Sequence, residues 1–386
     1  MSKGRTVAVL GGAAVAAAGA VAGGRLRNFY RELDFDTGHD EEIFAETTDG
    51  WRIALYRYAA RGEPKPYPIV AGHGFAGTRL IWDLTPETSL ARYLSRAGYD
   101  FYAIDLRGRG ESWPRTGSRA DSQWSFDDFV ERDLPAAVAR ACERSDAPEV
   151  FWLGLEMSGQ VLYASAVAGT ATHVRGGITF GAPVLTPPTA KVPGVTTQPH
   201  VRRGGRVKFR AGAHFAGPIL ALVKSHQLES SFRPENVDPI VPARYLSHGV
   251  PDEATVLADQ FADWIEHGVM RSLDHTSVWS ERLDEVGLPL LIVAAAHDLQ
   301  RPPEATRAAY EAIGSRDKTW IEAGVSSGFS LDFGHDDLVA GRASPVEVFP
   351  KVRAWLDEHS ISVAKDRPSP RRAPRPPSEA GRAGLQ

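Results

Sequence analysis

The sequence predicts an α/β protein with a mostly parallel β-sheet, helices on both faces of the sheet and an inserted helical cap. Apolar strand-like runs alternate with helix-like runs up to about residue 184, and the same pattern resumes at Leu288. This alternation is typical of a parallel sheet covered by helices. The stretch between these two parts is Pro-rich and then helical, without a strong strand pattern. We therefore expect a core at residues 30–184 and 285–363 and a cap at 185–284.

The expected elements follow one another at short intervals. Residues 42–60 predict a hairpin around a Thr-Asp-Gly turn, and a strand from Tyr67 ends in a glycine-rich loop. Pro135 is expected to kink a helix over residues 126–144. The remaining expected strands begin near residues 99, 150, 176, 288 and 318, and the remaining core helices span 89–97, 303–313 and 345–359.

The most informative stretch is Val-Phe-Trp-Leu-Gly-Leu-Glu-Met-Ser-Gly at residues 150–159. An apolar run turns into a helix-like run across small residues, which predicts a nucleophile elbow, a tight strand-to-helix turn that presents one side chain in a cleft. The best register begins at Gly154 and puts Glu156 at the nucleophile position. A second register would make Ser158 the nucleophile, and a third interpretation is an ordinary strand–helix junction with an acid at the helix N-terminus.

Composition excludes some classes of protein. The formal charge is −4 with 44 basic and 48 acidic residues, so the fold has no basic stripe for nucleic acid. Cys142 is the only cysteine, which rules out an intrachain disulfide. We find neither a metal-ligand cluster nor a phosphate-binding glycine loop, so no cofactor is expected.

Both ends of the chain differ in composition from the core. Residues 7–24 consist of Ala, Val, Gly and one Leu between basic residues, which predicts an uncleaved membrane anchor, a cleaved export signal ending near Ala20-Val-Ala22, or an Ala/Gly-rich arm. We therefore define residues 1–29 as an anchor or signal segment and expect a membrane-anchored or exported protein. Residues 364–386 are basic and Pro-rich, which predicts a disordered tail.

Several motifs in order resemble the α/β-hydrolase superfamily, in particular acid lipases and relatives of polyhydroxyalkanoate synthases. The resemblance covers about residues 40–362 apart from the cap. It depends on these motifs: His-Gly-Phe at 73–75, Asp-Leu-Arg-Gly-Arg-Gly-Glu-Ser at 105–112, the elbow, His-Asp-Leu-Gln-Arg-Pro-Pro at 297–303, and Gly-His-Asp-Asp-Leu at 334–338.

The resemblance implies a catalytic group at the carboxyl ends of the strands. Glu156 would stand at the elbow, Asp298 would orient His335, and His335 would act as the base. The backbone N–H groups of Phe75 and Met157 would form an oxyanion hole. We further expect substrate contacts from His73, Gly74, Trp82 and Trp264.

Glu156 departs from the family pattern. Relatives with a carboxylate nucleophile, such as epoxide hydrolases and haloalkane dehalogenases, use the shorter Asp, and ordinary esterases use Ser. Three interpretations stay open: a hydrolase of a small apolar ester-like substrate, or of an epoxide or halide; a catalytically degenerate hydrolase that binds a ligand or partner; and a scaffold. The sequence does not indicate an oligomeric state.

Overall fold

The computed structural model describes residues 28–29, 31–119, 122–184 and 205–361. The predicted N-terminal anchor or signal, the basic tail and the start of the predicted cap lie outside these residues. No helix in the described ranges is long and apolar enough to span a bilayer.

An eight-stranded sheet in the order β1-β2-β4-β3-β5-β6-β9-β10 forms the centre of the fold. Its strands are β1 (Glu41–Glu46), β2 (Arg52–Tyr58), β3 (Ile69–Gly72), β4 (Phe101–Asp105), β5 (Val150–Leu155), β6 (Val174–Phe180), β9 (Leu290–Ala295) and β10 (Lys318–Ala323). β2 pairs antiparallel with both β1 and β4, and the pairs from β4 to β10 are parallel. The mostly parallel α/β sheet predicted from the alternating pattern is confirmed.

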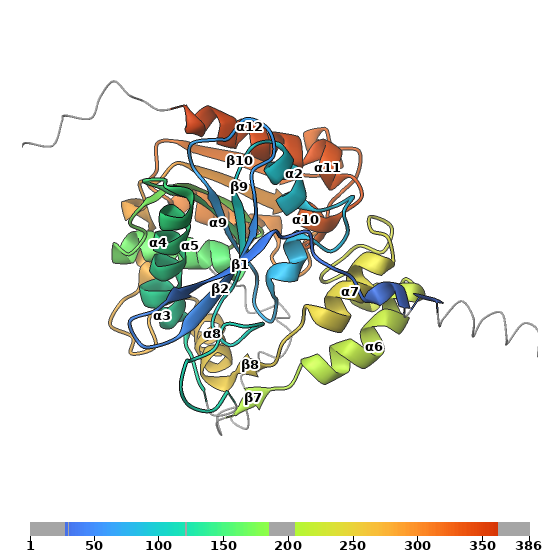
Figure 1. The fold of residues 1–386 in the computed structure, drawn as a ribbon, viewed down its shortest axis with the longest axis horizontal. Coiled ribbons are helices and arrows are strands. Elements are labelled where there is room, and N and C mark those ends of the chain that lie inside the picture. The colour runs from blue at the N-terminus through green and yellow to red at the C-terminus, as the bar shows by residue number, and fades with distance from the viewer. Residues whose placement is uncertain (1–27, 30, 120–121, 185–204, 362–386) are drawn as a thin grey trace, which may run out of the picture.

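Helices cover both faces of this sheet (Figure 1). They are α2 (Leu90–Arg96), α3 (Phe126–Asp128), α4 (Leu134–Ser145), α5 (Met157–Ala168), α9 (Pro303–Ala312), α10 (Asp337–Ala340), α11 (Ser344–Glu347) and α12 (Phe349–Ser360). Successive residues of β5 show why two faces are buried: Trp152 belongs to one apolar core and Phe151 and Leu153 to the other. Because strand side chains alternate, a continuous apolar run is what a strand covered on both faces requires.

The expected kink near Pro135 takes a specific form. The turn at Phe129–Asp133 is a π-helix, and α4 begins directly after it with Pro135 as its second residue. Proline lacks an N–H and fits the first turn of a helix, so it starts a new helix here instead of bending one.

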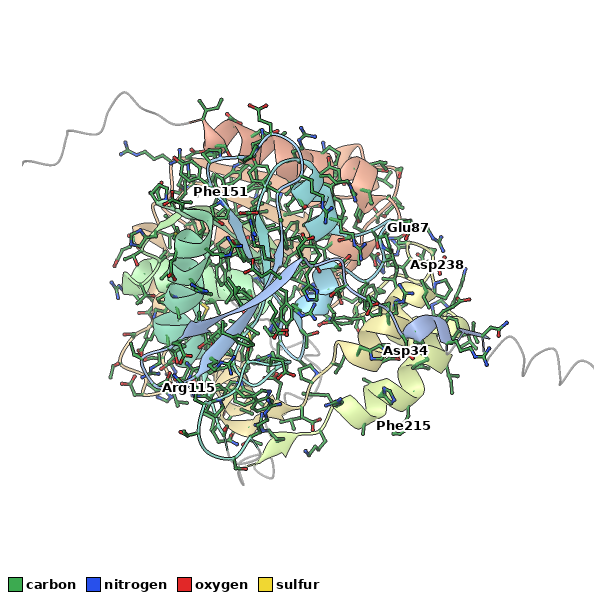
Figure 2. All side chains as sticks on the ribbon, viewed as in Figure 1. Asp34, Glu87, Arg115, Phe151, Phe215 and Asp238 are labelled. Carbon is green, nitrogen blue, oxygen red and sulfur yellow. The ribbon has the colours of Figure 1, made fainter. Side chains whose placement is uncertain are left out.

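The predicted cap is divided between two positions. α6 (Arg210–Leu222) and α7 (Ile240–His248) pack against each other at one edge of the molecule (Figures 1 and 2). The short strands β7 (Arg206–Val207) and β8 (Glu253–Ala254) pair and connect this hairpin to α8 (Thr255–His267). The apolar side of α8 lies in the main core against α3, so among the cap helices that the structure describes α6 and α7 are the ones free to cover a site.

Candidate active site

The turn between β5 and α5 is the predicted elbow, in the register that places Glu156 at its tip. Glu156 has φ 48° and ψ −108°, a strained conformation for a residue with a side chain. Its N–H donates to the carbonyl of Phe180 at 2.8 Å, and its carbonyl accepts from the N–H of Gly159 at 2.9 Å. A Cβ at Gly154 would lie 2.4 Å from the Gly159 nitrogen, so the turn needs a glycine there.

Ser158 is not the elbow nucleophile. Its side chain is fully buried, and its hydroxyl donates to the carbonyl of His73 at 2.5 Å. A Cβ on Gly72 would meet this hydroxyl, so Ser158 occupies the narrow space between the elbow and β3. The alternative register is therefore wrong.

Glu156 forms a buried ion pair with Arg301, a residue to which the sequence analysis assigned no role. Oε1 accepts hydrogen bonds from Nε of Arg301 at 3.1 Å and from one of its terminal nitrogens, and both side chains are almost completely buried. Oε2 accepts from the Phe75 N–H at 2.6 Å. The first predicted oxyanion donor thus binds the elbow carboxylate itself, and Met157, the second, is the buried first residue of α5.

Asp298 and His335 are paired as predicted. The Asp298 carboxylate lies 2.6 Å from Nδ1 of His335, and its other oxygen accepts the backbone N–H groups of Gln300 and Arg301 at 2.9 and 2.7 Å. The loop after β9 therefore fixes Asp298 by its own backbone. Since this carboxylate binds Nδ1, Nε2 of His335 is the nitrogen that can exchange a proton with a substrate.

The electrostatics favour a charged pair. Burial alone would raise the pKa of Glu156, but Arg301, His335 and the Phe75 N–H together lower it below its usual value. Burial would lower the pKa of His335, but Asp298, followed by Asp336 and Glu156, raises it to about 9. At neutral pH the site therefore holds an ionised Glu156 and a protonated His335.

A cavity of about 280 Å³ lies over these groups and contacts Glu156, Arg301 and His335. Its apolar walls come from the loop after β3, the end of β5 and the cap: Phe75, Leu155, Phe209, Ala213, Leu246 and Val250. Tyr245, Gln300, Ser231 and Asp336 add polar groups. The volume is near the lower end for ligand pockets, which suits a small and largely apolar ligand.

Among the expected substrate contacts, only Gly74 lines this catalytic cavity. A Cβ there would come 2.9 Å from Oε2 of Glu156, so glycine lets the loop approach the elbow. His73 is fully buried, with Nδ1 on the Gly74 carbonyl and Nε2 on the Leu106 N–H. It therefore supports the loop and does not contact the cavity.

The two tryptophans are also core residues. Trp82 is fully buried against Phe101 and Phe180, and Trp264 packs in the aromatic cluster of α3 and α8. The expectation that Trp82 and Trp264 contact substrate is wrong, because both large apolar side chains gain more from burial in the core than from a cavity wall.

Arg301 was detectable in principle. A buried carboxylate needs a compensating charge, and Arg301 follows Asp298 by three residues at the carboxyl end of a strand, where the site residues gather. Fold and site together define a hydrolase-type enzyme with a carboxylate at the elbow.

Comparisons with known proteins agree with this class. The chain belongs to the α/β-hydrolase superfamily. The family model described as serine aminopeptidase, S33, matches residues 79–218. A poly(3-hydroxyalkanoate) polymerase subunit PhaC of Haloferax mediterranei is 24% identical over 85% of this chain and 67% of its own length. Human lipase member J is 28% identical over 30% of this chain and 34% of the lipase.

The fold also matches solved structures. The monoacylglycerol lipase of Paleococcus ferrophilus superposes with a TM-score of 0.52 at 20% identity, over 79% of this chain and 99% of that chain. A soluble variant of monoglyceride lipase from Saccharomyces cerevisiae gives 0.55 at 18% identity, over 85% and 98%. The acid-lipase and polyhydroxyalkanoate-synthase resemblance predicted from the motifs is confirmed at the level of the superfamily.

Proposed function

We propose that the protein hydrolyses the ester bond of a small apolar substrate in two steps, with Glu156 as the nucleophile. The observation that carries this proposal is that the Glu156 carboxylate and His335 line the same largely apolar cavity. The lowered pKa of Glu156 and the raised pKa of His335 favour a carboxylate nucleophile beside a protonated imidazole. The lipases among the relatives support an ester as the substrate class.

In the first step the hydrogen bond from the Phe75 N–H moves from Oε2 of Glu156 to the substrate carbonyl oxygen. Arg301 continues to bind Oε1. Oε2 then attacks the carbonyl carbon. A C–O bond forms between Glu156 and the acyl group, and the bond to the alcohol breaks. The departing alkoxide receives its proton from Nε2 of His335.

In the second step His335 acts as the base. It has lost its proton, and acylation has removed the Glu156 charge that helped to raise its pKa. Neutral His335 takes a proton from water, and the resulting hydroxide attacks the acyl carbon. The acid leaves, Glu156 becomes a carboxylate again, and His335 is protonated for the next cycle.

A second candidate is alkyl transfer from an epoxide or halide to Glu156. Two nitrogens of Arg301 donate to Oε1, where negative charge would develop if water attacked an alkylated Glu156. The two routes differ in where oxygen from solvent is incorporated. A single turnover in ¹⁸O-water labels the acid product in the ester route and Glu156 in the alkyl route, which peptide mass spectrometry separates.

The test of the proposal is turnover of 4-nitrophenyl esters from acetate to octanoate. Glu156→Gln, which keeps the side-chain shape, should abolish turnover, and the exposed Glu281→Gln serves as the matched control. His335→Gln should accumulate an acyl adduct on Glu156, because 4-nitrophenolate leaves without a proton but hydrolysis lacks its base. Activity of Glu156→Gln equal to that of the parent would refute the proposal.

A further inference from the structure

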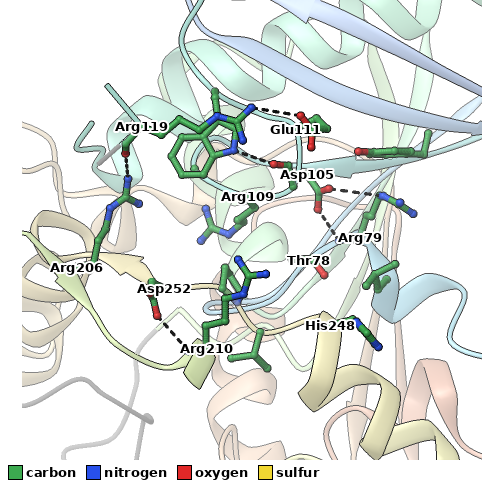
Figure 3. A pocket seen from close by; sticks show the side chains of 17 residues that line it. Thr78, Arg79, Asp105, Arg109, Glu111, Arg119, Arg206, Arg210, His248 and Asp252 are labelled. Carbon is green, nitrogen blue, oxygen red and sulfur yellow. Dashed lines mark hydrogen bonds and ion pairs between the residues drawn. The ribbon is translucent and has the colours of Figure 1, made fainter. Parts of the chain in front are cut away.

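A second cavity of about 590 Å³ lies beside the catalytic cavity, at the carboxyl end of β4 (Figure 3). We call it the basic cavity, because five guanidinium groups line it: Arg79, Arg109, Arg119, Arg206 and Arg210. They come from the start of the short helical turn after β3, the glycine-rich loop after β4, the strand β7 and the first residue of α6. Elements of the core and the cap therefore meet here and bring like charges together.

Three of these arginines have a carboxylate partner. The pairs are Arg79 with Asp105 at 3.6 Å, Arg109 with Glu253 at 2.6 Å and Arg119 with Glu111 at 3.3 Å. The Arg109–Glu253 pair is completely buried, so its charges compensate each other within the protein.

Arg206 and Arg210 have no carboxylate within ion-pair distance among the residues that the structure describes. The last acid of the wall, Asp252, binds Lys208 at 2.9 Å and accepts the backbone N–H groups at the start of α6. Arg206 lies 4.2 Å from the ring centre of Trp124 and donates to the backbone carbonyl of Arg119. Burial, with Arg109 contributing, lowers the pKa of Arg206 although Glu253 acts against it. Two cations here thus lack an ion-pair partner in the described part of the chain.

Two buried donors in the wall also lack partners. The hydroxyl of Thr78 and Nε of Arg109 are buried without a hydrogen-bond partner in the described part of the chain. Such groups are rare in proteins, because each costs roughly the desolvation of a polar group. The side chains of Arg109 and Arg210 extend into the cavity from opposite sides (Figure 3). A ligand with several acceptor oxygens would supply acceptors and a counter-charge to Arg206 and Arg210, which line the cavity.

The basic cavity adjoins the catalytic one. Val250 lines both, and Phe209 of the catalytic cavity is followed directly by Arg210 of the basic cavity. A ligand that spans them would have an apolar part over Glu156 and a charged part among the arginines.

We infer that the basic cavity binds a phosphate or carboxylate group carried by the substrate whose ester bond lies against Glu156. Guanidinium groups bind such oxyanions through paired hydrogen bonds. The substrate class is then an anionic amphiphile, an inference that rests on the proposed ester hydrolysis.

The kinetic test compares a neutral 4-nitrophenyl ester with one of equal length that ends in a carboxylate. The parent should prefer the anionic ester, and Arg210→Gln should lower the ratio of the two kcat/KM values about tenfold or more, as expected for one charge-assisted contact. Arg316→Gln, an exposed arginine between α9 and β10, is the matched control and should keep the parent ratio. An unchanged ratio in Arg210→Gln would overturn the inference.

A binding test does not depend on turnover. Octyl phosphate, titrated calorimetrically into the full chain, should bind, and Arg210→Gln and Arg206→Gln should each weaken it about tenfold. If inorganic phosphate binds as tightly as octyl phosphate, the cavity is a free-anion site and the inference is overturned. If octyl glucoside binds as tightly, binding depends on the apolar chain alone and the inference is overturned as well. Arginine-dependent binding of octyl phosphate without turnover of any ester would support the anion site and refute the proposed hydrolysis.

Discussion

The carboxylate of Glu156 and the guanidinium of Arg301 form a buried ion pair although 145 residues separate them in the chain. The elbow after β5 presents the carboxylate and the loop after β9 presents the guanidinium, next to the Asp298–His335 pair. An elbow with a carboxylate is thus accompanied by a cation that keeps it ionised, which a serine elbow would not need.

The first prediction is that Arg301→Met destabilises the protein by about 3–5 kcal/mol, because the buried Glu156 carboxylate loses its ion-pair partner and keeps as a nearby cation His335, which is itself paired with Asp298. Urea unfolding followed by circular dichroism would show a lower midpoint with an unchanged slope.

The double variant Arg301→Met/Glu156→Gln is the control. It removes both charges and should regain much of the lost stability. If the two substitutions were simply additive, the two side chains would not be energetically coupled, and the ion pair would have no measurable role in stability.

The sequence predicted the part of this site that depends on local pattern. Gly154 and Gly159 surround the elbow because a Cβ at Gly154 would collide with the elbow backbone and a Cβ at Gly159 would collide with the side chain of Ala182. Such constraints leave a recognisable motif. The place of Asp298 and His335 in the site was predictable from the order of the strands and helices, since the carboxyl ends of parallel strands meet at one edge of the sheet.

The rest depends on packing between distant segments. His73, Trp82 and Trp264 are the residue types that line pockets, and nothing in their neighbours distinguishes a cavity wall from a core. Arg301 pairs across the sheet with a residue on another loop.

Localisation stays a prediction, because residues 7–24 lie outside the described ranges. Fractionation of the tagged full chain tests it.

The second prediction concerns Gly74. Gly74→Ala places a Cβ 2.9 Å from Oε2 of Glu156, so the attacking oxygen must shift from its position beside the Phe75 N–H. We expect a loss of about a hundredfold in kcat with little change in stability, since a misplacement of roughly 1 Å at a reacting atom has such an effect.

Gly212→Ala is the matched control for this change. Gly212 lies in α6, and no atom would contact an added Cβ within 4 Å. It should keep the parent kcat. A Gly74→Ala variant with the parent kcat would mean that the position of Oε2 does not matter for the reaction.

The third prediction is that kcat/KM for an ester with a poor leaving group, such as a phenyl ester, falls as pH rises through about 9. His335 carries its proton in the folded protein up to that pH, and the first step needs the proton for the leaving alkoxide. The stability that His335 adds is present below about pH 6.5, its unfolded pKa, and is lost as pH rises through about 9.

The His335→Gln variant should therefore lack this alkaline change in the urea midpoint, which separates His335 from other groups that titrate there. A rate that rises through about pH 6.5 and stays constant beyond pH 9 would contradict the prediction, since it would mean that neutral His335 begins the reaction.

The last prediction is that Glu156→Ser changes the chemistry of the elbow. Removing the carboxylate takes away one of the charges that raise the pKa of His335 and leaves Arg301 unpaired, so His335 becomes a neutral base at a lower pH. With Asp298 in place, the introduced hydroxyl completes a Ser-His-Asp group on the same backbone turn.

A fluorophosphonate reagent should label the variant at position 156 and leave the parent unlabelled, because Ser158 is fully buried. Glu156→Ala, which removes the same charge without adding a hydroxyl, is the control and should stay unlabelled. Adding Arg301→Met to Glu156→Ser should raise the unfolding midpoint, because it removes the unpaired cation. If intact-mass measurement finds no label on Glu156→Ser while the variant is folded by circular dichroism, then His335 does not reach the elbow position, and its assignment as the base that serves Glu156 is wrong.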